Sequence, residues 1–158
     1  FPRKVRDFMK NSCFLLFFLS LIFSNSALAS NQKLCDALYE YLRATTSNNS
    51  LRVKLINDWS SFSKQCKSYE SSVAGVFCKS LMSHTSTEFM KLNLISVLEC
   101  ANADIAFKNL TIEEMSGSLT IYKIPKINEN IEMTITFSFG YVDVNDFVEI
   151  STRYEEFD

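Results

Sequence analysis

The sequence predicts an α+β fold in which about four helices, braced by disulfides, precede a three-stranded antiparallel β-meander that packs on them. Three observations lead to this prediction. Apolar residues recur with a helical period before residue 115, they alternate with a period of two after it, and four cysteines lie in the helical part. The 158 residues include 47% hydrophobic residues but only three glycines and two prolines, which is enough apolar material for one buried core.

Residues 1–29 have the pattern of upstream residues followed by a secretory signal peptide. Lys10 precedes an apolar run from Cys13 to Phe23, and the small residues after it end at Ala29 in an A-x-A cleavage motif. The run spans 11 residues, whereas a membrane-spanning helix needs about 20. We therefore expect cleavage after Ala29, a secreted or periplasmic protein without a stable membrane anchor, and a single α+β domain over residues 30–158.

Four helices are expected in the first part of the domain. The first covers residues 31–43, and Ser50 can cap the second. The apolar stripe that predicts the second helix is formed by Leu51, Leu55, Trp59, Phe62 and Cys66. The third covers residues 71–83. The fourth covers residues 87–106 and is apolar on nearly all sides, which predicts that it is the buried centre of the domain.

Three strands are expected after a connection over residues 102–114. Residues 119–124 are rich in β-branched side chains and stop at Pro125. Residues 131–139 alternate strictly between apolar and polar side chains, and residues 147–154 form the third strand. Because short loops join antiparallel neighbours, these strands are predicted to form a meander.

The cysteine pattern predicts two disulfides. The four cysteines beyond the predicted signal peptide are Cys35, Cys66, Cys78 and Cys100, and an even number in an exported chain is typical of a disulfide framework. In an up-down-up-down order of four helices all of them lie at one end. This order pairs Cys35 with Cys100 and Cys66 with Cys78. A zinc site is not expected, because there is no C-x-x-C motif and the chain has one histidine.

The predicted domain is acidic, and its acidic excess lies at the C-terminal end. Residues 30–158 carry 12 basic and 17 acidic side chains, and residues 116–158 alone carry 3 basic and 8 acidic ones. An acidic surface attracts basic partners. Solubility and protection of a sheet edge are the alternative explanation for the same excess. A nucleic-acid partner is not expected, since it requires a basic face.

The sequence contains no catalytic motif that we can identify. G-x-S-x-G, H-E-x-x-H and glycine-rich phosphate loops are missing. His84 is the one side chain suited to act as a base near neutral pH, and its position between two predicted helices favours a solvated or capping role. The run Asp143-x-Asn145-Asp146 is similar to the start of a calcium loop, but the fifth position is Phe147 and the twelfth is Tyr154, which do not supply the required ligands. We therefore expect neither enzymatic activity nor a cofactor.

The remaining features favour a small exported protein that binds or inhibits another protein, for example a basic one in the manner of bacterial immunity proteins. The candidate binding surface is the turn over residues 139–146 with Tyr141, Asp143 and Asp146, where aromatic and acidic groups lie close together on a loop. Two alternatives remain. One is an envelope structural or accessory subunit that assembles through an edge strand, and the other is a small hydrolase that uses His84.

Overall fold

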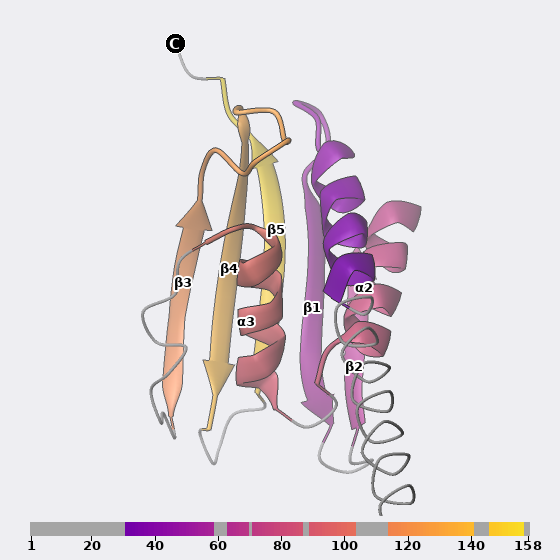
Figure 1. Ribbon diagram of the computed structural model, residues 1–158, viewed down its shortest axis with the longest axis vertical. Coiled ribbons are helices and arrows are strands. Elements are labelled where there is room, and N and C mark those ends of the chain that lie inside the picture. The colour runs from indigo at the N-terminus through magenta and orange to yellow at the C-terminus, as the bar shows by residue number, and fades with distance from the viewer. Residues whose placement is uncertain are drawn as a thin grey trace, which may run out of the picture.

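The computed structural model describes residues 31–58, 63–69, 71–86, 89–103, 114–140 and 146–156. These residues form two layers, in which helices cover one face of a five-stranded antiparallel sheet (Figure 1). Residues 31–43 are helical and are called the first helix below. The other elements are β1 (Leu51–Asp58), β2 (Ser63–Tyr69), α2 (Ser72–His84), α3 (Met90–Cys100), β3 (Met115–Ile121), β4 (Ile131–Phe139) and β5 (Phe147–Tyr154).

The predicted α+β class is confirmed, but the predicted architecture of four helices and a three-stranded meander is wrong. The described residues form three helices and five strands. The error lies in the predicted second helix. The described residues expected to form it belong to β1 and β2, which pair as antiparallel strands. Leu51 and Leu55 share one side of a strand as well as one side of a helix, so their spacing fits both structures. Val53 decides between them, because it is also fully buried and lies between them on the same face of β1.

The C-terminal strand β5 is the centre of the sheet, whose strand order is β2-β1-β5-β4-β3. It pairs with β4 on one side, as the predicted meander requires, and with β1 on the other. Val53 lies opposite Ile150, and Leu55 lies opposite Val148. This long-range pairing gives β1 a partner on each edge, and it explains why residues 51–58 extend instead of forming a helix.

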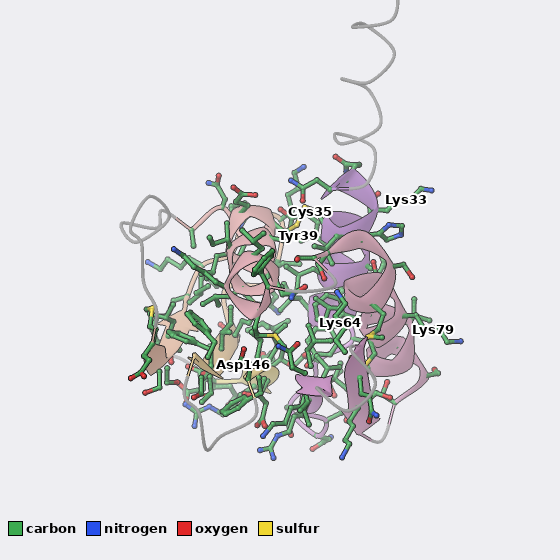
Figure 2. The ribbon with its side chains drawn as sticks, turned by 90° about the horizontal axis from the view of Figure 1, so that it is seen from below. Lys33, Cys35, Tyr39, Lys64, Lys79 and Asp146 are labelled. Atoms are coloured by element: carbon green, nitrogen blue, oxygen red, sulfur yellow. A yellow bond between two sulfur atoms is a disulfide. The ribbon has the colours of Figure 1, made fainter. Side chains whose placement is uncertain are left out.

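Two disulfides join the helical layer together and to the sheet. Cys35 of the first helix is bonded to Cys100 at the end of α3, and Cys66 of β2 is bonded to Cys78 of α2 (Figure 2). These are the two pairs expected from the sequence, although the all-helical order used to derive them does not hold, since Cys66 lies on a strand. Two such bridges indicate an oxidising environment.

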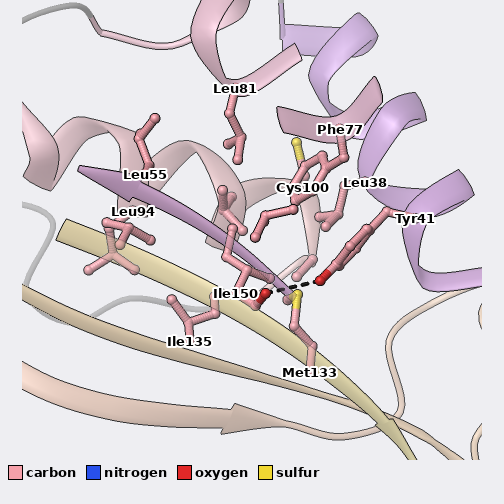
Figure 3. Packing of buried hydrophobic residues seen from close by; sticks show 14 of the residues in the cluster. Leu38, Tyr41, Leu55, Phe77, Leu81, Leu94, Cys100, Met133, Ile135 and Ile150 are labelled. Atoms are coloured by element: carbon pink, nitrogen blue, oxygen red, sulfur yellow. Dashed lines mark hydrogen bonds between the residues drawn. The ribbon is translucent and has the colours of Figure 1, made fainter. Parts of the chain in front are cut away.

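The core lies between the sheet and the helices, with α2 over β1 and β2 and with α3 over β4 and β5 (Figure 1). Tyr41 of the first helix is fully buried, and its ring lies 4.7 Å from that of Phe77 of α2. Its hydroxyl donates a hydrogen bond of 3.0 Å to the carbonyl oxygen of Ile150 (Figure 3). Burial raises the pKa of Tyr41. The first helix is therefore tied to the central strand.

Helix α3 differs from the predicted central helix over residues 87–106. It is shorter, and it covers the sheet with one side only. Met90, Leu94 and Leu98 are buried against the sheet, whereas Leu92 is 46% exposed. An apolar helix can therefore lie at the surface and leave apolar side chains uncovered.

The predicted signal peptide and its cleavage site after Ala29 lie outside the described residues. Within the described ranges, no helix is both long enough and apolar enough to cross a membrane.

Candidate functional site

Several connections between elements meet at one end of the sheet. Because neighbouring strands are antiparallel, the last residues of β1 and β4 lie at the same end of the sheet as the first residues of β2 and β5. Helix α2 ends there and α3 begins there (Figure 1). We call this region the loop end and define it by its described residues, which are Asn57, Lys64, Thr85, Ser86, Phe89, Gly140 and Asp146. Figure 2 is a view onto this end, with Lys64 and Asp146 labelled.

Asp146 is the one residue of the predicted binding turn's acidic and aromatic set that the structure describes. Its Oδ1 accepts a hydrogen bond of 2.9 Å from the backbone N–H of Gly140, and its Oδ2 accepts one of 3.2 Å from the Asn57 side-chain amide. The backbone carbonyl of Asp146 also accepts the Asn57 N–H at 2.9 Å. Gly140 has a φ of 87°, which a residue without Cβ adopts without strain.

The Asp146 carboxylate therefore links Gly140, which follows β4, and Asn57 of β1 to the start of β5. This structural role was not predicted, because Asn57 was assigned to a helix. Tyr141 and Asp143, the other two residues predicted for partner binding, lie outside the described residues. Their roles stay predictions.

Lys64 is a buried lysine that the sequence analysis missed. It lies on the helix-covered face of β2 and is only 4% exposed. Its ammonium donates to the carbonyl oxygens of Leu81 at 3.0 Å and of Ser86 at 2.6 Å. It also donates to Thr85 Oγ1 at 2.7 Å and to Asn93 Oδ1 at 3.2 Å. Three N–H donors are thus surrounded by four oxygen acceptors from the end of α2, the connection and α3.

The surroundings of Lys64 explain its electrostatics. Burial lowers its pKa to about 8, because the charged form loses its hydration. The last carbonyl groups of a helix carry partial negative charge, so a cation at this position stabilises the end of α2. Because Nζ is buried among oxygen atoms, we interpret Lys64 as a structural cation that fixes the α2–α3 connection to β2.

His84 is the last residue of α2 and is partly exposed. Among the described residues, no group of three or more His, Cys, Asp or Glu side chains is arranged to hold a metal ion.

Two large apolar side chains are exposed next to the loop end. Phe89, which precedes α3, is 60% exposed, and Leu92 in its first turn is 46% exposed. The N–H of Leu92 donates to the carbonyl oxygen of Phe89 at 3.1 Å, so the two residues belong to one turn. Exposed apolar side chains rimmed by polar groups are typical of protein-binding surfaces. The sequence does not predict this exposure, because the apolar pattern of residues 87–106 indicates a helix buried on all sides.

Comparisons with models of known protein families, with curated protein sequences and with solved structures find no match to this chain. The function is therefore argued from the arrangement of residues alone. That arrangement is a disulfide-braced two-layer domain with exposed apolar side chains at a fixed end of its sheet.

Proposed function

We propose that this chain is a small exported protein that binds another protein without catalysing a reaction, and that it binds through the loop end of its sheet. The observation that carries the proposal is the exposure of Phe89 and Leu92 next to described residues that are held by hydrogen bonds. Aromatic and apolar side chains of this kind provide most of the binding energy at protein interfaces.

Hydrogen bonds among the described residues of the loop end favour binding. Lys64 donates hydrogen bonds to Thr85 and Ser86, which follow α2. Asp146, which precedes β5, accepts a hydrogen bond from Asn57 of β1. The Cys35–Cys100 bridge fixes the other end of α3 to the first helix. A surface that is already ordered loses less conformational entropy when a partner binds, and this increases affinity.

The chemistry of the partner follows from charge. Residues 116–158 carry eight acidic side chains, of which Glu132 lies in β4 and Glu149 in β5, and the others lie in the connections around these strands or after β5. This acidic excess favours a basic partner. Tyr141 and Asp143 stand in the sequence between Gly140 and Asp146, two residues at the loop end. Export through the predicted signal peptide agrees with the presence of two disulfides. An inhibitor of a basic exported protein, similar in role to an immunity protein, fits these features.

The experiment uses residues 30–158 with both disulfides intact, immobilised and exposed to proteins from the same exported fraction. The test variant is Phe89→Ser/Leu92→Ser. The matched control is Val76→Ser, which changes an equally exposed apolar residue on α2, away from the loop end. We expect a basic protein to bind the wild type and the control equally well. It should bind the test variant at least about tenfold more weakly, and its binding to the wild type should weaken at high salt.

Equal binding of this protein to the wild type and both variants would place its site elsewhere and contradict the proposal. A hydrolytic activity that is present in the wild type and lost in His84→Ala would contradict the absence of catalysis.

A further inference from the structure

A groove runs along the flank of the molecule between α2 and the edge strand β2. Its volume is about 350 Å³. The residues that line it include Cys66 and Ser68 of β2 and Gly75, Cys78, Lys79 and Met82 of α2. Because the Cys66–Cys78 disulfide bonds the strand to the helix, the separation of the two walls is fixed.

The backbone of β2 beside this groove faces a free edge. The Asn57 N–H donates to Asp146 across β1 and β5, so the N–H and C=O groups of odd-numbered residues in β1 point toward β5. Even-numbered residues of β1 therefore point toward β2 and pair with Gln65 and Lys67. By alternation, the backbone groups of Cys66 and Ser68 point away from β1, toward the edge that no described strand occupies.

These two observations concern the same residues. Cys66 and Ser68 direct their backbone groups to the free edge and their side chains into the groove. An extended chain that pairs with β2 would place side chains opposite Cys66 and Ser68 on the same face of the sheet. Those side chains would enter the groove, whereas the alternate ones would lie on the other face beside Lys67.

Charge selects the kind of chain that fits. Lys79 lines the groove and Lys67 lies on the outer face of β2, both are exposed, and no described carboxylate pairs with either. Lys67 and Lys79 are the exposed basic side chains of β2 and α2 beside the groove, whereas Lys64 is buried and Arg52 and Lys54 of β1 pair with Glu149. Lysines on an edge strand disfavour pairing with neutral or basic strands, and they attract acidic ones.

We propose that the β2–α2 groove binds an extended acidic segment of a partner protein, which adds to the sheet as a sixth strand at the free edge of β2. This surface is distinct from the loop end, and the segment it takes has the opposite charge to the partner proposed for that end. Backbone pairing with Cys66 and Ser68 provides affinity, and the groove together with Lys67 and Lys79 provides selectivity.

Gly75 offers a direct way to block the groove. A Cβ atom added there would lie 3.8 Å from Ser68 Oγ, which is an ordinary contact, so Gly75→Ala is compatible with the fold. A larger side chain at the same position, as in Gly75→Leu, would extend into the space between helix and strand. Lys79→Glu tests charge instead, at an exposed position.

The probe is a fluorescently labelled eight-residue peptide of two Glu-Glu-Val-Val repeats, which places glutamates on both faces of a strand. The control is a peptide of two Lys-Lys-Val-Val repeats of the same length. Binding to residues 30–158 is measured by fluorescence anisotropy. We expect the acidic peptide to bind at least about tenfold more tightly than the basic one, with affinity that falls as salt is added. Gly75→Leu and Lys79→Glu are each expected to weaken binding about tenfold, and Gly75→Ala and Phe89→Ser/Leu92→Ser are expected to leave it unchanged.

A second readout locates the peptide. Hydrogen exchange at the amides of Cys66 and Ser68 is expected to slow when the acidic peptide is bound. Equal binding of both peptides, full binding by Gly75→Leu, or unchanged exchange at these two amides would overturn the inference. So would a dimer that forms through β2 while the peptide fails to bind. Since Phe89→Ser/Leu92→Ser affects only the loop end, failure of this inference is distinguishable from failure of the proposed function.

Discussion

Replacing Lys64 by methionine removes the buried ammonium and keeps most of the volume of the side chain. The acceptors left behind include the carbonyl oxygens of Leu81 and Ser86 and the side-chain oxygen of Asn93. Hydrogen bonds to a charged donor contribute about 1.5–3 kcal/mol each, while loss of the ammonium also removes its cost of desolvation. We expect Lys64→Met to lower the free energy of unfolding by about 2–4 kcal/mol near pH 7.

The effect depends on pH in a direction that follows from the pKa of Lys64. Burial lowers it from 10.5 to about 8, so between these values the unfolded chain holds a proton that the folded protein has released. The unfolded state then binds more protons, and raising the pH favours the folded state by at most about 1.4 kcal/mol per pH unit. Below pH 8 both states are protonated and Lys64 adds no pH dependence. The stability difference between wild type and Lys64→Met should therefore widen from pH 8 upward.

Urea denaturation followed by far-ultraviolet circular dichroism measures both effects. Lys67→Met is the matched control, because Lys67 lies on the same strand but is exposed on the other face. We expect the control to change stability by less than about 0.5 kcal/mol. If Lys64→Met is as stable as Lys67→Met, the Lys64 side chain does not have the structural role argued above. If the deficit stays constant from about pH 8 to about pH 10, the lowered pKa of Lys64 is contradicted.

Two further predictions concern the core and the bridges. Tyr41→Phe removes one buried hydrogen bond to β5 and is expected to lower the free energy of unfolding by about 1 kcal/mol, as measured by urea denaturation. Replacing both cysteines of the Cys35–Cys100 bridge by alanine should cost more than the same change at Cys66–Cys78, because the sequence separations are 65 and 12 residues. In the chain-entropy model the losses are about 4 and about 3 kcal/mol, a difference that thermal unfolding resolves.

The sequence predicts those elements in which only one periodicity is possible. Residues 131–139 alternate strictly, and β4 has these same bounds. Residues 147–154 and 71–83 also match β5 and α2 closely. The strand predicted over residues 119–124 is β3, which is shifted toward the N-terminus because it pairs with β4 as far as Met115. Strand bounds of this kind depend on a partner and are less visible in local sequence.

The loop end was only partly predictable because its contacts are long-range. The Lys64 acceptors lie between 17 and 29 residues further along the chain, and Asn57 lies 89 residues from Asp146. The acidic turn was recognised from its composition, but the internal hydrogen bonds of Asp146 follow from the pairing of β1 with β5. The disulfide pairs were predictable because adjacent elements bring Cys66 and Cys78 together whether residues 63–69 are helix or strand.

Val53 provides a direct test of β1, which the sequence wrongly predicts as part of a helix. In the predicted second helix it lies off the stripe of Leu51 and Leu55, and Val53→Ala would stabilise the protein slightly because alanine has the higher helix propensity. In β1 it is fully buried opposite Ile150, and the same change removes two methyl groups from a packed core, which costs about 2 kcal/mol. The two structures therefore predict effects of opposite sign.

Ile56→Ala is the control for this test. Ile56 lies on the other face of β1 and is only partly buried, so the loss of stability on its replacement should be smaller. Urea denaturation of the three proteins decides the matter, and a Val53→Ala variant at least as stable as the wild type would contradict the position of β1 in the sheet.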